Sequence, residues 1–237
     1  MATRTVANGG GNWGTTSTWV EGAVPTSADD VVFTATSGQL TINVTASCKS
    51  INFTNYTNTI TFNNAIFLSV FGNITFVTGF TINTTPNNSG IITAANSTIV
   101  SNGVTWPAVF RFGGFTHTLS DNMIIYRMEG AGSSSPVING NKIYVTNTCF
   151  LYNGSIMSGT TEIIFYTGCN TFSLGGTARF YNNFTINTNT TIAIAGLVTG
   201  GNIIKYISGT VLPVPSIVLD RTGTTLDTSG MTWGDVS

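Results

Sequence analysis

Short runs in which apolar and polar residues alternate recur along the chain at a nearly constant interval. The run Leu-Thr-Ile-Asn at 40–43 returns as Ile-Thr-Phe-Asn at 60–63 and as Phe-Thr-Ile-Asn at 80–83. Apolar residues stand at the first and third positions, which is the period of a β-strand with one buried face. The interval predicts an all-β, parallel β-solenoid (β-helix) with about 20 residues per coil.

Two further sets of apolar residues support this repeat. One set keeps the same step and consists of Ile51, Phe71 and Ile91. The other keeps it except for one longer step in the middle, and consists of Ile143, Ile163, Phe184 and Ile204. We therefore expect regular coils over 31–102 and over 142–208, within a single β-solenoid domain spanning 1–237.

The first repeat also predicts which side chains stack between rungs about 4.8 Å apart. The expected inner column is Leu40, Ile60 and Phe80. The expected outer column is Thr41, Thr61 and Thr81. A ladder of side-chain amides that bond to one another at a corner is expected from Asn43, Asn63 and Asn83.

The segments outside the regular coils differ in composition. Residues 103–141 contain Trp-Pro at 106–107 and several glycines, so coils with longer loops are expected there. Residues 1–30, with two tryptophans among glycines, are expected to cap the N-terminal end. Residues 209–237 are expected to form a C-terminal cap or a docking segment. Caps are needed because a solenoid ends in an open sheet edge.

Composition narrows the class of partner. Only 7% of the residues are charged, 41% are hydrophobic, and the formal net charge is −1. No basic surface is available for phosphates, so a nucleic acid is not expected as a partner. No apolar run approaches the roughly 18 residues of a membrane helix, and the N-terminus lacks the features of a secretory signal. We expect no membrane association and synthesis in a cytosol.

The cysteines do not form a disulfide scaffold. There are three, Cys48, Cys149 and Cys169, and an odd number leaves at least one unpaired. One step of the repeat separates Cys149 from Cys169, which predicts adjacent rungs where a disulfide is geometrically possible. A buried column without a bond is favoured because the chain is expected in a reducing compartment.

The N-terminal segment carries a motif that combines Asn-Trp-Gly at 12–14, Trp19, Val-Pro-Thr at 24–26 and Ala-Asp-Asp-Val-Val-Phe at 28–33. It resembles the opening module of Thr-rich β-solenoid virion proteins of tailed bacteriophages. A similar pattern opens repeats in autotransporter-like adhesins. The resemblance covers the motif segment up to Phe33, and beyond it only the style of repeat. It implies a virion structural protein, such as a capsid decoration, head fibre or tail fibre, often a homotrimer. It brings no catalytic residues.

The acidic residues are few and scattered. Of nine, only Asp29 and Asp30 are neighbours, and adjacent residues of a strand point to opposite faces. A glycosidase needs two carboxylates facing one cleft at roughly 5 to 9.5 Å. Asp121 and Glu129 would meet only through folding, and a solvated loop position is favoured for them.

Other candidate chemistry is equally sparse. The single histidine, His117, alternates onto an apolar face and is expected to be a satisfied, partly buried side chain rather than part of a triad. No spacing suits zinc or calcium. We predict no catalytic, cofactor-binding or metal-binding residues. Four residues of the middle segment suit contact with a sugar or a partner protein, although packing of a loop explains them equally well: Trp106, Arg111, Tyr126 and Arg127.

Three functions remain open. The favoured one is a structural virion component that assembles passively onto capsid or tail proteins, made in the host cytoplasm without a signal peptide. The second is a receptor- or glycan-binding fibre or adhesin, and the threonine columns also raise ice binding. The third is a polysaccharide-degrading, tailspike-like enzyme, which the scarcity of acids disfavours.

Overall fold

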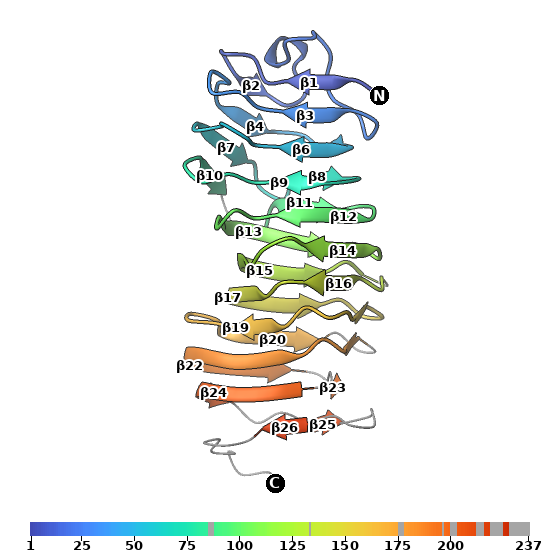
Figure 1. The fold of residues 1–237 in the computed structure, drawn as a ribbon, viewed down its shortest axis with the longest axis vertical. Helices are drawn as coiled ribbons and strands as arrows, with labels where there is room; N and C mark the ends of the chain where they lie inside the picture. Colours follow the sequence, from blue (N-terminus) through green and yellow to red (C-terminus); the bar gives the residue numbers. More distant parts are fainter. Residues whose placement is uncertain are drawn as a thin grey trace.

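Apolar β-branched and aromatic residues alternate with Thr, Ser and Asn, which favours strands. The strands are short because turn residues interrupt this alternation every few positions. The computed structural model is a rod of stacked parallel coils about 21 residues apart (Figure 1). The predicted all-β solenoid is therefore confirmed. The structure describes residues 1–84, 88–132, 134–174, 178–195, 197–199, 203–211, 216–218 and 225–227. Side chains are described to residue 187, apart from 179 and 180.

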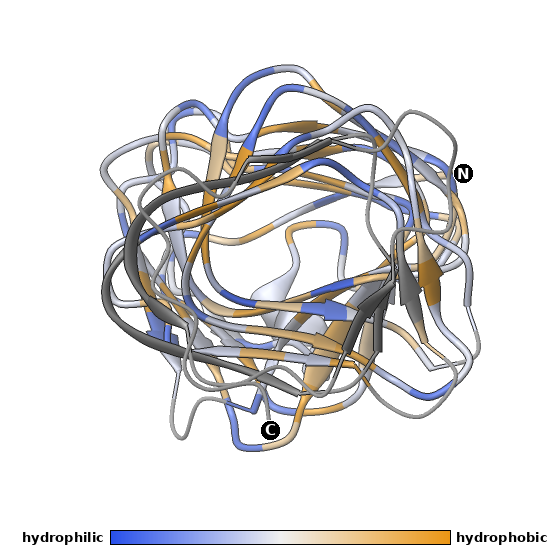
Figure 2. Cartoon of the chain, turned by 90° about the horizontal axis from the view of Figure 1, so that it is seen from below, coloured by the Kyte–Doolittle hydropathy of each residue, from blue (hydrophilic) through white to orange (hydrophobic). Residues whose placement is uncertain are grey.

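Three sheets run along the rod, and Figure 2 shows the coils superposed around one axis. Sheet 1 consists of β1 (Thr3–Thr5), β3 (Asp30–Val32), β6 (Ser50–Asn52), β9 (Ile74–Thr75), β12 (Ser97–Val100), β14 (Thr116–Leu119) and β16 (Val137–Gly140). Sheet 2 consists of β2 (Gly11–Asn12), β4 (Leu40–Ile42), β7 (Thr59–Phe62) and β10 (Thr81–Thr84).

Sheet 3 is the longest. It consists of β5 (Ala46–Cys48), β8 (Phe67–Val70), β11 (Gly90–Thr93), β13 (Thr105–Phe112), β15 (Met123–Gly130), β17 (Ile143–Leu151), β19 (Ile163–Phe165), β20 (Thr171–Leu174), β22 (Phe184–Ala195), β24 (Ile203–Val211) and β26 (Thr225–Asp227). Two separate pairs are β18 (Ile156–Met157) with β21 (Arg179–Phe180), and β23 (Leu197–Thr199) with β25 (Ser216–Val218). The 3-10 helix η1 spans Thr16–Thr18.

Stacked phenylalanines occupy the core behind sheet 1. Phe33, Phe53 and Phe76 each directly follow a strand of that sheet. Their ring centroids are 4.6 Å apart between Phe33 and Phe53, and 5.6 Å between Phe53 and Phe76. Near-parallel rings at these separations add a specific attraction to the burial of apolar area. The ladder therefore ties three consecutive coils together from inside.

The first predicted column is right for two rungs and wrong for the third. Leu40 lies opposite Ile60, as expected, but Ile60 lies opposite Ile82 and not Phe80. The reason is a longer corner: Ile42 and Ala46 are four positions apart, whereas their partners Phe62 and Leu68 are six apart. Phe80 instead stacks on Phe53 at 4.8 Å between ring centroids. The outer column consequently consists of Thr41, Thr61 and Asn83. Thr81, which we expected in this column, lies opposite Thr59.

The other two predicted sets had opposite outcomes. Ile51 pairs with Ile74 in sheet 1, whereas Ile91 pairs with Leu68 in sheet 3, so that set is not a column. Phe71 is an exposed corner residue. The later set is confirmed through three successive pairings of β17, β19, β22 and β24: Ile143 with Ile163, Ile163 with Phe184, and Phe184 with Ile204.

The predicted amide ladder of Asn43, Asn63 and Asn83 is wrong, because Asn83 lies opposite Thr61 and the Asn43 oxygen accepts from the Gly14 N–H at 3.3 Å. Other asparagine side chains do join successive coils, through hydrogen bonds to the backbone. Side-chain oxygens that accept from an N–H of the following coil include those of Asn73, Asn96, Asn122 and Asn139. Side-chain NH₂ groups that donate to a carbonyl of the preceding coil include those of Asn58, Asn102, Asn141 and Asn182. Corners leave backbone groups outside the sheet ladder, and an amide can satisfy either kind.

The middle segment, 103–141, forms coils, as expected, but among its described residues the expected longer loops are absent between the strands. β13 and β15 are eight residues each, and the longest connection between its strands is 131–136. A bulge between Trp106 and Val109 bends β13, and it holds Pro107, which cannot donate to a ladder. The buried indole of Trp106 donates to the Val109 carbonyl across this bulge at 3.1 Å. Pro107 therefore marks a bend within a strand, not a loop.

The N-terminal segment caps the rod and also contributes its first rungs, because β1 pairs with β3 and β2 pairs with β4. The chain folds back so that Ala7 N–H donates to the Thr18 carbonyl and Val20 N–H to the Thr5 carbonyl. These antiparallel bonds occupy the edge of β1 that would otherwise be open. The predicted cap at 209–237 is described only at 209–211, 216–218 and 225–227, which are strand residues, and otherwise lies outside the described residues.

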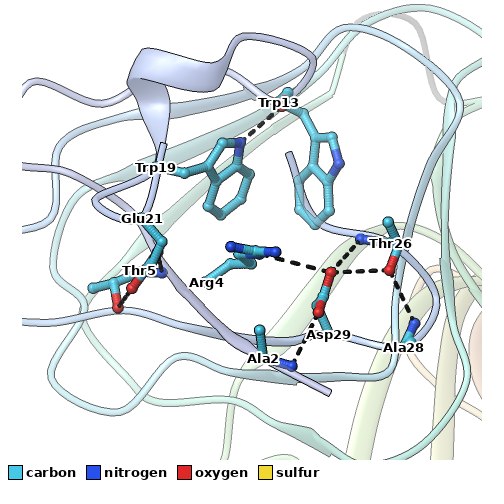
Figure 3. Close-up of polar contacts among 9 residues, drawn as sticks. All are labelled: Ala2, Arg4, Thr5, Trp13, Trp19, Glu21, Thr26, Ala28 and Asp29. Atoms are coloured by element: carbon cyan, nitrogen blue, oxygen red, sulfur yellow. Dashed lines mark hydrogen bonds and ion pairs between the residues drawn. The ribbon is translucent and has the colours of Figure 1, made fainter. Parts of the chain in front are cut away.

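Side chains of the N-terminal motif hold the cap together, as Figure 3 shows. The rings of Trp13 and Trp19 meet edge to face at 5.0 Å, and the Trp19 indole N–H donates to the Trp13 carbonyl at 2.9 Å. The Asp29 carboxylate accepts from the hydroxyl and N–H of Thr26 and from the N–H of Ala2. These hydrogen bonds lower the pKa of Asp29, because they stabilise its ionised form.

Candidate functional site

One side of the rod differs from the rest in the chemistry of its outward side chains. Outward positions of sheets 1 and 2 are mostly Thr, Ser and Asn. On the outer side of β15, β17 and β19 and directly after them, aromatic and aliphatic residues gather instead, and we call them the aromatic face. The aromatic face consists of Ile124, Tyr126, Tyr144, Phe150, Tyr152, Ile164 and Tyr166. Tyr166 is exposed, Ile164 is buried, and the other five are partly exposed.

Strand register places these residues in contact. Ile124 lies opposite Tyr144, and Tyr144 lies opposite Ile164. The rings of Tyr144 and Tyr166 meet edge to face at 5.4 Å, and those of Phe150 and Tyr152 at 4.7 Å. Tyr, Phe and Arg are the residue types enriched in the centres of protein interfaces. The aromatic face therefore has the composition of a contact surface.

A charged cluster borders this face. Arg111 on β13 and Glu129 on β15 lie opposite each other in the parallel register. The Glu129 Oε2 accepts from Arg111 Nε at 2.8 Å and from Arg111 Nη2 at 2.6 Å, and Arg127 Nη2 lies 2.6 Å from Oε1. The Tyr152 hydroxyl donates to the same Oε2 at 3.3 Å. A carboxylate is thus held by two guanidinium groups and a phenol.

Aromatic rings shield the cluster from solvent. The Arg111 guanidinium carbon lies 4.3 Å from the centroid of the Phe67 ring and 5.4 Å from that of Tyr152. The Glu129 side chain has no exposed surface, whereas that of Arg127 is 29% exposed. The three charged groups sum to one positive charge. The cluster therefore joins the strands and keeps one positive charge in excess, and both arginine side chains are partly exposed, Arg111 at 19% and Arg127 at 29%.

Glu129 is not the solvated loop residue that we expected. It lies on a strand, and its buried position is stable because both arginines pair with it. Asp121 precedes the same strand and accepts from the N–H groups of Ser101 and Asn102 at 2.7 and 2.6 Å. The stretch of strand from Met123 to Glu129 spans roughly 20 Å when extended. The two carboxylates do not share a cleft.

The remaining acidic pair and the histidine are also structural. Asp29 is buried in the cap, and Asp30 accepts from the Ser50 hydroxyl at 2.5 Å on the other side of the strand. His117 is fully buried, beyond the partial burial we expected. Its Nε2 lies 3.1 Å from the Gly113 carbonyl, which can only accept, so Nδ1 accepts from the Ser97 hydroxyl at 2.8 Å. Burial lowers the pKa of His117.

The cysteines are buried and unbonded. Cys149 lies opposite Met128 and Phe172, so it does not share a register with Cys169 as predicted. Cys169 lies in the bend between β19 and β20, where the coil has extra residues. Burial raises the pKa of Cys169 to about 12, and raises that of Cys149 and Cys48 as well. Such thiols are poor nucleophiles because the thiolate is disfavoured.

Of the four residues flagged in the middle segment, Arg111 and Arg127 come together at Glu129, Tyr126 is half-buried nearby in sequence, and Trp106 belongs to the core. Glu129 and Tyr152 were missed as members of the cluster. In the sequence, Glu129 stands 18 residues after Arg111 and 23 before Tyr152, and both steps differ from the main repeat. Because the coils differ in length, a search at one fixed step does not bring these residues together.

Across the described part of the chain, no group of three or more His, Cys, Asp or Glu is placed to hold a metal ion. Within the same residues, no helix is long and apolar enough to cross a membrane. Comparison with models of protein families, with curated proteins and with solved structures gave no match.

Proposed function

We propose that this chain is a structural component of a tailed-phage virion, a capsid-decorating or fibre protein that assembles passively through its aromatic face. The observation that carries the proposal is the contrast between this face and the Thr- and Asn-rich outer surface elsewhere. An aromatic surface with an accessible arginine is suited to another protein. The resemblance of the N-terminal motif favours a virion over other assemblies.

The use of the ionisable residues also supports a mechanical role. Asp29, Asp121 and Glu129 each accept several hydrogen bonds that join coils or close the cap. Groups committed in this way keep the backbone in place and are not free to transfer protons. The rod then works through its stiffness, and we propose no enzymatic step. A homotrimer joined along the aromatic face is the assembly we propose.

The oligomeric state tests the role of the aromatic face. Light scattering of the full chain at micromolar concentration is expected to give a trimer, and Tyr166→Ser is expected to weaken it. Phe71→Ser is the matched control, because Phe71 is 41% exposed, like Tyr166 at 40%, but lies at a corner outside the face. A monomer at this concentration, or equal effects of both variants, contradicts assembly through this face.

The virion assignment needs a separate test. An antibody against the chain is expected to label purified particles of the phage that encodes it, and the purified protein is expected to sediment with that phage's empty capsids or tails. Particles that carry no label and bind no added protein would overturn the assignment, whatever the oligomeric state.

A further inference from the structure

Sheet 1 carries a shallow polar hollow on its outer side, away from the aromatic face. Its volume is about 260 Å³, and it is lined by Asn73, Asn96, Ser97, Thr98, Thr116 and Thr118. These residues come from three consecutive coils: Asn73 and Asn96 from the corners before β9 and β12, and the other four from β12 and β14. None of the six is charged.

The two asparagines of the hollow are held in fixed orientations. The Asn73 side-chain oxygen accepts from the Thr98 N–H at 2.9 Å, and the Asn96 oxygen accepts from the Thr116 N–H at 2.9 Å. Because each amide has its oxygen committed, its NH₂ group points elsewhere with both hydrogens available. Both side chains are exposed. The hollow thus has two oriented donors.

The threonines complete a mixed set of donors and acceptors. Thr98, Thr116 and Thr118 are exposed and point outward, and Thr98 lies opposite Thr118 on the next rung. Within the described residues, their hydroxyls make no hydrogen bond to protein. β-branched side chains have few rotamers, so these hydroxyls lose little freedom when they bind a ligand.

Two exposed phenylalanines lie close in sequence to residues that line the hollow. Phe71 is 41% exposed and lies two positions before Asn73, and Phe115 is 42% exposed and directly precedes Thr116. Both stand at the corner from which the chain enters sheet 1, with the coil of Asn96 between them. Two rung spacings separate the two coils, which is about 9.6 Å. Apolar surfaces beside a few fixed polar groups are typical of small-ligand sites.

The floor of the hollow is rigid. Ser97 and His117 face the core beneath Thr98 and Thr118, and their side chains are joined by the 2.8 Å hydrogen bond described above. The ring of His117 packs on Phe112 at 5.4 Å between centroids. A ligand would therefore meet a preformed surface, which lowers the entropic cost of binding.

From these observations we propose that the hollow on sheet 1 binds a neutral saccharide, whose ring reaches the phenylalanines of the adjoining corners. An uncharged ligand with many hydroxyls matches a site that has donors and acceptors but no charge, and the apolar faces of a sugar ring match the two phenylalanines. A charged saccharide would leave its charge without a partner there. This site is independent of the proposed structural role, because it lies on another sheet.

An array of oligosaccharides tests the proposal with the full-length chain. The uncharged probes contain glucose, galactose, mannose or N-acetylhexosamines, and sialylated and sulfated forms are the charged comparison. Binding to a subset of the uncharged probes is expected, followed by titration calorimetry with the best of them. Asn96→Asp keeps the oxygen that accepts from Thr116 but removes the donor, so we expect affinity to fall about tenfold or more.

A matched control is Asn122→Asp. The Asn122 oxygen accepts from the Lys142 N–H at 3.1 Å in the same way, but Asn122 does not line the hollow. Thr118→Val should also reduce binding about tenfold at unchanged thermal stability, because the side chain is exposed and its shape is preserved. No binding to any uncharged probe at millimolar concentration, binding only to charged probes, or equal losses in Asn96→Asp and Asn122→Asp would each overturn the proposal.

Discussion

The guanidinium of Arg111 and the carboxylate of Glu129 meet through two hydrogen bonds of 2.8 and 2.6 Å, one coil apart on neighbouring parallel strands. The pair forms only when the coil between the two residues has this length. A coil one residue longer or shorter would point one of the side chains into the core. Arg127 and Tyr152 extend this link over three coils.

Removing the carboxylate should destabilise the rod strongly. Glu129→Ala leaves two arginines without their partner in a largely covered site, and we expect the free energy of unfolding to fall by about 3 kcal/mol. Lys142→Ala breaks the more exposed Lys142–Glu162 pair at 3.0 Å and should cost under about 1 kcal/mol. Urea denaturation of the two variants measures both, and equal losses would contradict a special role for Glu129.

The phenylalanine ladder should be the most sensitive part of the core. Phe53 contacts rings on both neighbouring coils, so Phe53→Ala opens a cavity that neither coil can close. We expect a loss of about 3 to 5 kcal/mol in urea denaturation. Phe71→Ala, at an exposed corner, is the control and should change stability by less than about 1 kcal/mol. A small effect at Phe53 would mean that the coils do not unfold together.

Stability should depend on pH through His117. Burial lowers its pKa in the folded protein, and its neighbours Ser97, Thr93 and Gly113 offer no negative charge. As pH falls below about 6.5, the unfolded chain therefore binds the proton first, and stability declines until the folded form also titrates. Melting temperatures between pH 8 and 5 should fall in the parent chain. A His117→Gln variant that shows the same decline would point to another group.

Stability should decline a second time at lower pH, through two carboxylates of the N-terminal cap. Hydrogen bonds lower the pKa of Asp29. At Glu21 partial burial raises the pKa, but the hydrogen bonds from Thr5 outweigh it, so the pKa of that carboxyl is lowered as well. Their stabilisation is present above the unfolded pKa values, near 4, and is lost as pH falls further. Asp29→Asn should remove part of this acid sensitivity and leave the decline near pH 6 unchanged. Loss of both declines in this variant would show that the two regions are coupled.

The cap is expected to keep the rod ends apart. Trp19→Ala removes the ring that packs on Trp13 and loosens the segment paired with β1, so an open strand edge becomes available. Light scattering should then show species whose mass grows with concentration beyond that of the parent assembly. A variant that only melts earlier, with no growth in mass, would contradict this role.

The thiols should be unreactive until the chain unfolds. Cys48, Cys149 and Cys169 are buried, and burial raises their pKa values. Iodoacetamide at pH 8 should label none of them in the native protein and all three in denaturant, as mass spectrometry measures. Native labelling of Cys169 would contradict its burial, and fewer than three labelled thiols in denaturant without a reductant would indicate a disulfide.

The candidate sites were only partly visible in the sequence. Arg111 and Arg127 could be singled out as accessible cations in the middle segment, but Glu129 was assigned to solvent because a lone acid normally remains there. Its burial depends on a step of 18 residues to Arg111, which a search at the main repeat does not find. The hollow on sheet 1 uses corner asparagines whose orientation depends on backbone groups one coil away.

The alternation of apolar and polar residues by itself determined that the chain forms short strands with one buried face, and the regular step between the runs determined that they stack in parallel. The alternation is a local property, since each strand needs only its own side chains to define its inner face. The register depended on corner lengths, which the tertiary structure alone decided. Phe62 and Leu68 are two positions further apart than their partners, and this moved Ile82, not Phe80, onto Ile60. The lengths of the corners within a coil together decide which residues lie opposite each other on neighbouring coils, including Arg111 and Glu129.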